Sequence, residues 1–196
     1  MIKRKVIYSQ MVSLDGYIEG PHHEIDWGKP GEELFQHFNE QEKDFDTHLY
    51  GRKTYENMRD YWSERAEARE ASKDEVEFAR MWNKIEKVVF SNTLEKVEGN
   101  SILVNNDIEA VINHRKEQSG KHMSLGGATL AETFIKLGLI DEYHLYIHPI
   151  LLGGGRRLFP SLQTKTNLEL IESKVFDQTV AMLRYTPIMK HKKEEG

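Results

Sequence analysis

Short runs of apolar and β-branched residues alternate along the chain with segments of helical periodicity. The runs predict strands at residues 5–12, 48–50, 87–90, 102–104, 122–125 and 143–150. Between them, Leu34 and Phe38 repeat at helical spacing after Pro30, and residues 129–137 form a second helical repeat that Gly138 is placed to end. This alternation predicts an α/β sheet of mainly parallel strands joined by crossover helices.

The last quarter of the chain has the pattern of an antiparallel hairpin. Residues 168–176 and 180–185 are extended runs, and the turn residues 177–179 separate them. A hairpin at this place closes one edge of the sheet. The predicted sheet is therefore mixed, mainly parallel with an antiparallel C-terminal end.

A highly charged segment, residues 63–84, interrupts the alternation. Its few apolar residues, among them Ala79 and Trp82, stand at helical spacing, which predicts a solvated helical insertion. The tail, residues 190–196, is polar and ends in Lys-Lys-Glu-Glu-Gly. No internal repeat or linker divides the rest, so we expect one domain over residues 1–189 that contains the insertion.

Composition and charge narrow the functional classes. Of the 196 residues, 38% are hydrophobic and 30% are charged, as in an ordinary globular protein. The 27 Lys and Arg residues against 32 Asp and Glu residues give a formal net charge of -5, which provides no general attraction to nucleic acid or anionic membranes. The absence of cysteine excludes disulfides, cysteine-ligated metals and a thiol nucleophile, and it fits a cytoplasmic protein. The first apolar run is too short and interrupted for a signal peptide or a membrane span.

The nine histidines do not form a metal-binding motif. No His-Glu-x-x-His sequence occurs. His144 and His148 are four residues apart on a predicted strand, where their side chains share a face but stand far apart. We therefore expect structural or solvated histidines and no metal site.

Two junctions between a predicted strand and a predicted helix have the character of an anion site. At the first, Gly51 is followed by Arg52 and Lys53, so that two cations stand at a helix N-terminus whose free N–H groups and dipole favour a phosphate. At the second, residues 125–130 include two consecutive glycines, which permit close approach of a diphosphate to the backbone. The second junction matches neither a dinucleotide fingerprint nor a P-loop, and each junction taken alone is better explained as an ordinary tight turn.

Two further segments carry polar groups suited to an anion. Ser91 and Asn92 follow a predicted strand, and ligands of open α/β sheets collect at such carboxyl ends. Arg156 and Arg157 follow three glycines. This last segment is either a flexible turn or part of a phosphate site, and its arginines favour the anion role.

The turn after the first strand and the approach to the first helix carry an acid and aromatic residues. Asp15 and Tyr17 lie in the turn, and Trp27 precedes the helix that begins near Glu32. Such residues suit a flat, nitrogen-rich heterocycle, which packs on an aromatic ring and presents its amidine-like edge to a carboxylate. Taken alone, Glu32 and its neighbour Glu33 are better explained as first-turn acids that face water.

Taken in order, these segments resemble the dihydrofolate reductase-like superfamily. The nearer resemblance is to its branch that includes the C-terminal reductase domain of the bifunctional riboflavin-biosynthesis enzyme. The residues that carry it lie in segments 6–18, 49–58, 88–91, 125–130, 139–143 and 149–160. The resemblance runs from Lys5 to Pro187 outside the charged insertion, and it implies a mixed α/β sheet with helices on both faces.

The resemblance implies an NADPH-dependent reductase that transfers a hydride to a small pterin-like or pyrimidine-like substrate. Met11 and Ile18 would border the nicotinamide, and Glu32 would be the carboxylate that assists protonation of the substrate. The other residues expected at the cofactor are Gly51, Arg52, Lys53, Thr54, Ser91, Asn92, Leu125, Gly126, Gly127, Ala128, Thr129 and Leu130. The residues expected at the substrate are Asp15, Tyr17, Trp27 and Arg156.

Two alternatives remain open. One is the 5-amino-6-(5-phosphoribosylamino)uracil reductase of riboflavin synthesis, whose phosphorylated substrate needs an anion site such as Arg156 and Arg157. The other is a nucleotide-binding protein on the same fold without catalytic turnover. By resemblance to the riboflavin branch we expect a homodimer. Residues 139–148 offer an apolar face for the dimer interface, but the same residues are also explained as part of the protein core.

Overall fold

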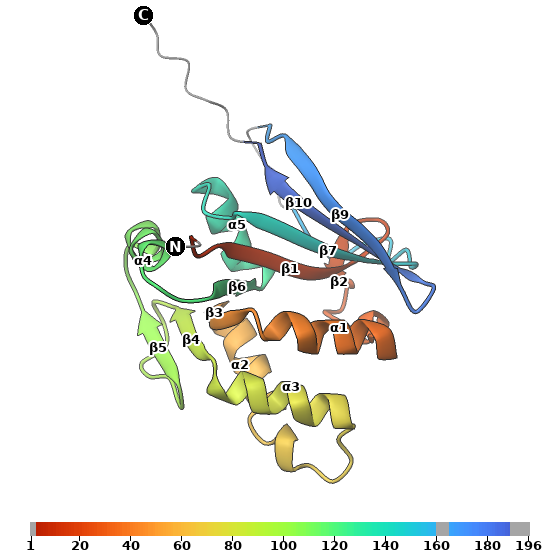
Figure 1. Cartoon of the computed structure of the whole chain (residues 1–196), viewed down its shortest axis with the longest axis horizontal. Helices are drawn as coiled ribbons and strands as arrows, with labels where there is room; N and C mark the ends of the chain where they lie inside the picture. The colour runs from red at the N-terminus through yellow and green to blue at the C-terminus, as the bar shows by residue number, and fades with distance from the viewer. Residues whose placement is uncertain (1–2, 160–164, 189–196) are drawn as a thin grey trace, which may run out of the picture.

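An eight-stranded sheet organises the protein, of which the computed structural model describes residues 3–159 and 165–188 (Figure 1). The strand order is β5-β4-β3-β6-β1-β7-β10-β9. Neighbouring strands from β5 to β7 pair in parallel, and β10 pairs antiparallel with both β7 and β9. The strands are β1 (Val6–Ser13), β3 (Phe45–Gly51), β4 (Glu86–Phe90), β5 (Ser101–Val104), β6 (His122–Gly126), β7 (Glu142–His148), β9 (Leu168–Phe176) and β10 (Val180–Pro187).

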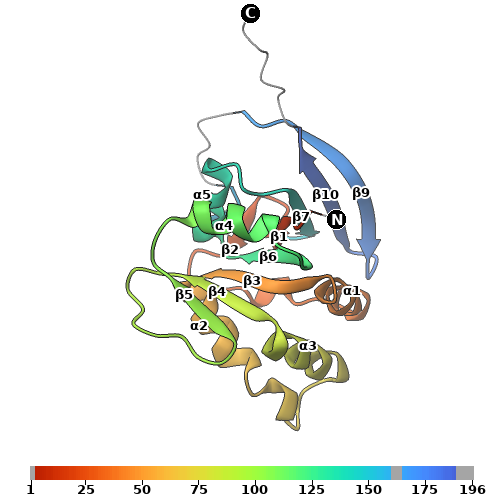
Figure 2. The same ribbon diagram turned by 60° about the vertical axis from the view of Figure 1, so that its left-hand side comes forward.

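The sheet confirms the predicted strands, the mixed topology and the C-terminal hairpin. The hairpin of β9 and β10 forms one edge of the sheet (Figure 2). Several boundaries differ by a few residues: β3 begins at Phe45 and not at residue 48, and β7 ends at His148 and not at residue 150. Pro149 has no N–H to give to a neighbouring strand, so pairing stops before it.

A small second sheet was not predicted. It pairs β2 (Tyr17–Glu19) antiparallel with β8 (Arg156–Arg157). Strands of three and two residues are too short to produce a periodic pattern. Gly155 permits the pairing, because its φ is +115° and a Cβ there would collide with the carbonyl oxygen of Glu19.

Helices cover both faces of the large sheet, as predicted. On one face lie α1 (Glu32–Glu42), α2 (Arg52–Trp62) and α3 (Lys73–Lys84), and on the other lie α4 (Ile108–Glu117) and α5 (Ala128–Lys136) (Figures 1 and 2). Two short 3-10 turns are η1 (Asp26–Gly28) and η2 (Arg65–Glu67). The predicted helix at 129–137 is α5, and Gly138 follows it with a φ of +65°.

The charged segment 63–84 is less solvated than its composition predicts. It holds η2 and α3, and α3 begins with a capping box between Ser72 and Glu75. Ala79 and Trp82 of α3 are buried, and Trp82 packs with Tyr50 and Val89 on the face of the sheet that α2 also covers. The segment is helical, as predicted, and Ala79 and Trp82 are its buried residues, while the tail 190–196 lies outside the described residues.

The two faces of the sheet differ in chemistry, because successive side chains of a strand point to opposite faces. The face under α4 and α5 is an apolar core that includes Tyr8, Leu49 and Phe134. The face under α1, α2 and α3 carries polar side chains at alternate positions of five neighbouring strands. These residues are Lys87 on β4, His48 on β3, Ser124 on β6, Ser9 on β1 and His144 on β7.

Candidate functional site

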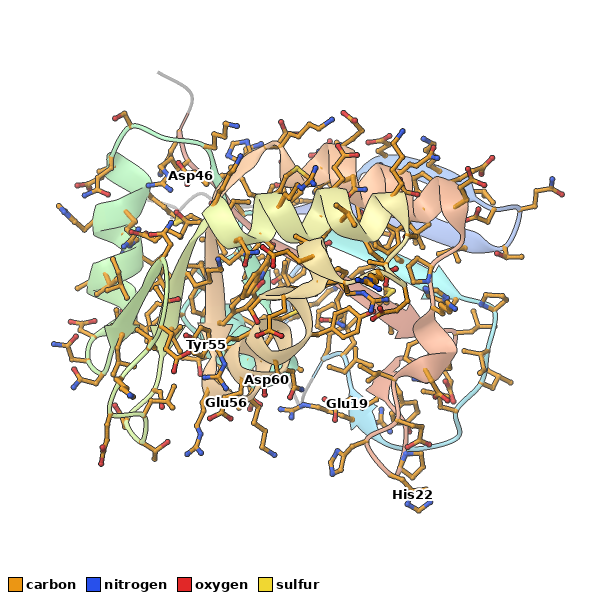
Figure 3. All side chains as sticks on the ribbon, turned by 90° about the horizontal axis from the view of Figure 1, so that it is seen from below. Glu19, His22, Asp46, Tyr55, Glu56 and Asp60 are labelled. Atoms are coloured by element: carbon orange, nitrogen blue, oxygen red, sulfur yellow. The ribbon has the colours of Figure 1, made fainter. Side chains whose placement is uncertain are left out.

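A cleft of about 1390 Å³ opens over the polar face, at the carboxyl ends of β1, β3, β4 and β6. This volume exceeds the roughly 300 to 1,000 Å³ of an ordinary small-molecule pocket. The cleft therefore has room for two ligands side by side. Figure 3 shows the molecule from the side of α1 and α3, with Glu56 on α2 and Glu19 on β2 set apart from each other. Glu19 belongs to the lining of the cleft.

Two helices open on the cleft without a side-chain cap. The helix α2 follows Gly51 and α5 follows Gly127, and neither residue offers a capping side chain. Elsewhere Ser72 caps α3, Asp107 caps α4, and the carboxylate of Asp177 accepts N–H groups in the first turn of α1. The first-turn N–H groups of α2 and α5 therefore have no N-cap side chain to accept them, and groups of this kind can hold an anion.

The glycine turn before α5 packs directly on the first turn of α2. A Cβ on Gly126 would lie 2.8 Å from Cε1 of Tyr50, and a Cβ on Gly127 would collide with the hydroxyl of Thr54. Gly127 also has a φ of +89°, which L side chains rarely adopt. The two glycines therefore allow both helix N-termini to reach the same part of the cleft.

Cations stand on both sides of these helix ends. The Nη1 of Arg52 donates to the hydroxyl of Thr93 at 3.1 Å, and its Nε donates to Glu56 at 2.9 Å. Arg52 thus connects α2 to the loop after β4, where Ser91 also lines the cleft. On the other side, the guanidinium of Arg156 donates to the hydroxyl of Thr129 in the first turn of α5.

All the residues expected at the cofactor line the cleft. The structure brings together Met11, Ile18, Gly51, Arg52, Lys53, Thr54, Ser91, Asn92, Leu125, Gly126, Gly127, Ala128, Thr129 and Leu130. They come from β1, β2, the carboxyl ends of β3, β4 and β6, and the N-termini of α2 and α5. Their roles at a cofactor remain predictions.

Of the residues expected at the substrate, Arg156 alone is part of the lining, beside α5. The carboxylate of Asp15 holds the loop after β7, because it accepts the backbone N–H groups of Leu152 at 3.1 Å and Gly153 at 2.7 Å. The hydrogen bond from Ser13 contributes most to the lowered pKa of Asp15. These contacts give Asp15 a structural role.

The two aromatic residues also lie outside the lining. The guanidinium of Arg157 stands 5.6 Å from the ring centre of Tyr17. The indole of Trp27 donates to the carbonyl of Glu24 at 3.2 Å and meets the ring of His148 edge-on. Neither aromatic residue is presented to a ligand in the cleft.

Glu32 does not reach the cleft. It is the first residue of α1, its side chain is exposed, and it accepts a hydrogen bond from the amide of Gln36 at 3.3 Å. Glu33 accepts the backbone N–H of Asp177 at 2.8 Å. Both acids are therefore turned toward the surface and toward the β9–β10 turn, and α1 reaches the cleft with its C-terminal half instead.

Sequence reasoning missed the polar inner end of the cleft. Gln41 and Glu42 of α1, His48 and Tyr50 of β3, and Tyr146 of β7 line it. The signal was present as polar residues at alternate positions in otherwise apolar strands, the pattern of a strand with one polar face. The histidines among them were interpreted as structural.

The described residues hold neither a metal-binding cluster nor a membrane-spanning helix. No group of three or more His, Asp or Glu residues in that part of the chain is arranged to hold a metal ion. In the same residues, no helix combines the length and apolar character needed to cross a membrane.

Known proteins share both the sequence and the fold. YyaP, an uncharacterized protein of Bacillus subtilis (strain 168), is 36% identical over 185 residues, which cover 93% of this chain and 95% of that protein. A structure from Shewanella sp. PV-4, provisionally named for riboflavin biosynthesis, has a TM-score of 0.73 at 23% identity and covers 94% of this chain and 99% of that one. Dihydrofolate reductase from Enterococcus faecalis, solved with NADP(H), has a TM-score of 0.61 at 13% identity, covering 93% of this chain and 96% of that one.

The family match spans most of the sequence. The RibD C-terminal domain family matches residues 4–182, which include the charged segment 63–84. The mixed sheet and its helices have the dihydrofolate reductase-like architecture. The chain therefore belongs to the RibD C-terminal domain family.

Proposed function

We propose that the protein is an NADPH-dependent reductase that transfers a hydride to a small pterin-like or pyrimidine-like substrate. One observation carries the proposal: two uncapped helix N-termini open side by side on a single large cleft, with Arg52 and Arg156 on either side of them. Backbone N–H groups, a glycine turn and flanking cations are the groups that bind a diphosphate. The family supports a reductase.

The residues of the cleft fit such a cofactor. The turn at Gly126 and Gly127 would hold the diphosphate, and Arg156 beside Thr129 adds a positive charge there. Arg52, the first residue of α2, and Ser91, in the loop after β4, would hold the 2′-phosphate of the adenosine. Bound NADPH would supply the hydride.

The chain's own contribution is orientation and shielding. Met11 and Ile18 present apolar side chains to the cleft and would border the nicotinamide, keeping water from the transferred hydride. A large part of the catalysis at such a site comes from holding the hydride donor in contact with the acceptor carbon of the substrate. We also propose that the protein acts in the cytoplasm as a homodimer.

The 5-amino-6-(5-phosphoribosylamino)uracil reductase remains the second candidate. It requires a further phosphate site, for which Arg156 and Arg157 were expected to act together. Arg156 contacts Thr129, whereas Arg157 lies over the ring of Tyr17. Because the two guanidinium groups make contacts at different places, they do not form one phosphate site. We therefore favour the first proposal.

Hydride transfer from NADPH labelled with deuterium at C4 tests the proposal. The protein is incubated with a panel of dihydropterins and aminouracils, and the products are analysed by mass spectrometry. We expect the label in a reduced pterin or pyrimidine. Transfer to the phosphoribosylaminouracil alone would favour the second candidate. Tight NADPH binding without transfer to any substrate would support a nucleotide-binding protein without turnover.

A further inference from the structure

A reductase that transfers a hydride to a C=N or C=O bond also has to deliver a proton to the nitrogen or oxygen. Five carboxyl or imidazole groups line the described part of the cleft: Glu19, His23, Glu42, His48 and Asp107. The side chains of Glu42 and His48 face each other and are only 8% and 2% exposed. The carboxylate of Asp107 accepts a backbone N–H group of α4. Of these five groups, Glu19 and His23 are therefore the two that remain open to a ligand.

Glu19 and His23 belong to a tight turn between β2 and η1. Glu19 ends β2, where it is the partner of Arg156 in β8. After it, the backbone N–H of Gly20 donates to the carbonyl of Glu24 at 3.0 Å, and the backbone N–H of His23 donates to the carbonyl of Gly20 at 3.0 Å. These hydrogen bonds fix the backbone of His23 without using its side chain.

The backbone of His23 has an unusual conformation. Its φ is +65°, a left-handed conformation that only about a few per cent of non-glycine residues adopt. In this conformation the imidazole reaches back to β2, where its Nδ1 lies 3.0 Å from Oε2 of Glu19. The imidazole is 83% exposed and the Glu19 side chain is 28% exposed. The ring is thus accessible both to a ligand in the cleft and to water.

We propose that His23 is the proton donor of the reduction and that Glu19 is the positioning residue that holds its ring. Because Nδ1 of an imidazolium ring donates to Glu19, the proton on Nε2 is left for the substrate. This role rests on the proposed function, and it replaces the one expected of Glu32, which is turned to the surface. Ile18, the expected neighbour of the nicotinamide, directly precedes Glu19 in β2.

The proton transfer completes the hydride transfer. On a dihydropterin, the hydride would add to the carbon of a C=N bond, the π electrons of that bond would move to its nitrogen, and this nitrogen would take the proton from Nε2 of His23. The products are NADP⁺, the reduced pterin and a neutral imidazole. The imidazole regains its proton from water, because it is exposed. A positioned acid of this kind typically contributes about a hundredfold or more to the rate.

His22 provides a matched control for His23. It is exposed in the same turn, but it is not among the described residues that line the cleft, and its backbone N–H donates to Oε2 of Glu24 at 2.7 Å. Figure 3 shows His22 at the tip of the turn, pointing away from Glu19. The two histidines are each replaced by glycine, because glycine accepts a positive φ and leaves room for added imidazole.

Single-turnover reduction of 7,8-dihydropterin by NADPH tests the role of His23, and NADPH affinity is measured separately by fluorescence. If the isotope assay labels a different acceptor, that acceptor replaces the dihydropterin. We expect His23→Gly to be slower by about a hundredfold with unchanged NADPH affinity, and added imidazole to restore part of the rate. His22→Gly should keep the full rate and should not respond to imidazole.

A double-mutant cycle tests the role of Glu19. Glu19→Gln should slow the reduction severalfold in the otherwise unmodified protein. The same change should cause no further loss in His23→Gly, because Glu19 acts through the imidazole that this variant lacks. Additive losses would show that Glu19 does not act through His23 and would overturn its positioning role.

A second readout does not depend on turnover. The protein is mixed with NADP⁺ in place of NADPH, 7,8-dihydropterin is added, and the histidine ring signals are followed by proton–carbon NMR. The signal that is missing from the spectrum of His23→Gly should shift, whereas the signal that is missing from that of His22→Gly should not. Equal shifts of the two signals, or no shift of either, would overturn the contact between His23 and the substrate.

The outcomes distinguish this role from the proposed function. The full rate in His23→Gly, equal losses in the two glycine variants, or a loss that imidazole does not restore would overturn the role of His23 and leave the reductase standing. Should His23→Gly fail to fold, His23→Asn decides, because asparagine tolerates a positive φ but does not act as an acid; the full rate in this variant would overturn the role. Absence of hydride transfer to every pterin and uracil of the panel would refute the proposed function, and the role of His23 with it.

Discussion

Glu142→Gln is expected to destabilise the protein at neutral pH and to remove much of its sensitivity to acid. Glu142 begins β7, and its side chain is 5% exposed. Its carboxylate accepts from Lys5 at 2.6 Å, from His144 at 2.9 Å and from Arg184 at 3.1 Å. Through His144 the same cluster reaches Gln41 in the lining of the cleft.

The magnitude follows from the pKa of this carboxyl group. Burial alone raises the pKa of Glu142, but the hydrogen bonds from Lys5, His144 and Arg184 outweigh burial and bring it from 4.5 to about 2. Because the folded-state pKa is the lower one, the stabilisation is present in full above pH 4.5 and is lost as the pH falls toward 2. A difference of this size corresponds to about 3 kcal/mol of unfolding free energy at neutral pH.

Urea unfolding of both proteins at pH 7 and at steps down to pH 3 measures the effect. The free energy of unfolding of Glu142→Gln should be lower by about 3 kcal/mol at pH 7, and the difference should shrink below pH 4.5. Glu172→Gln is the control, because Glu172 is 43% exposed and pairs with Arg184 at the surface, where such pairs contribute less than about 1 kcal/mol. Equal stability losses in the two variants, or parallel pH profiles of Glu142→Gln and the unmodified protein, would refute the reasoning.

Three further predictions concern the cleft and the buried cation beneath it. NADPH should bind more tightly than NADH, and Arg52→Ala should weaken NADPH by about 1.5 kcal/mol or more while NADH changes little, as measured by calorimetry; equal affinities of the unmodified protein for both cofactors would contradict the phosphate assignment. Gly127→Ala should weaken NADPH binding while the fold survives, because the new Cβ displaces Thr54 and adds about 1 to 2 kcal/mol of backbone strain; loss of the fold in circular dichroism would show that the glycine is chiefly structural. Burial lowers the pKa of Lys87 to about 8, so the stability of the unmodified protein should rise between pH 8 and 10.5, where the unfolded chain retains the proton that the fold has lost. Urea titrations of Lys87→Met should lack this rise, and its persistence would mean that another group is responsible.

Periodicity was sufficient to predict most of the fold, because long amphipathic or apolar runs have few structural solutions. It failed where the signal was short or local. The strands β2 and β8 have three and two residues. Helix α4 was not predicted, because its apolar residues Ile108, Val111 and Ile112 are confined to its first half and the second half is polar.

Residues of the cleft lining were predicted where a local sequence places them and missed where distant segments do. The positive φ of Gly127 is determined by the residues next to it in the chain. The same holds for the position of Arg52 at the start of α2. The orientation of α1 depends on Asp177, which caps it from the β9–β10 turn across 144 residues of sequence. That docking directs Glu32 to the surface and Glu42 into the cleft, and no local pattern encodes it.

A crystal structure of the protein with NADPH bound tests the central claim most directly. We predict the diphosphate at the N-termini of α2 and α5, beside Gly126 and Gly127, with the adenosine 2′-phosphate at Arg52 and Ser91. The nicotinamide should lie against Met11 and Ile18, with free space in the cleft over its reactive C4. A cofactor bound outside this cleft, or in the cleft with its adenine and nicotinamide ends exchanged, would contradict the account.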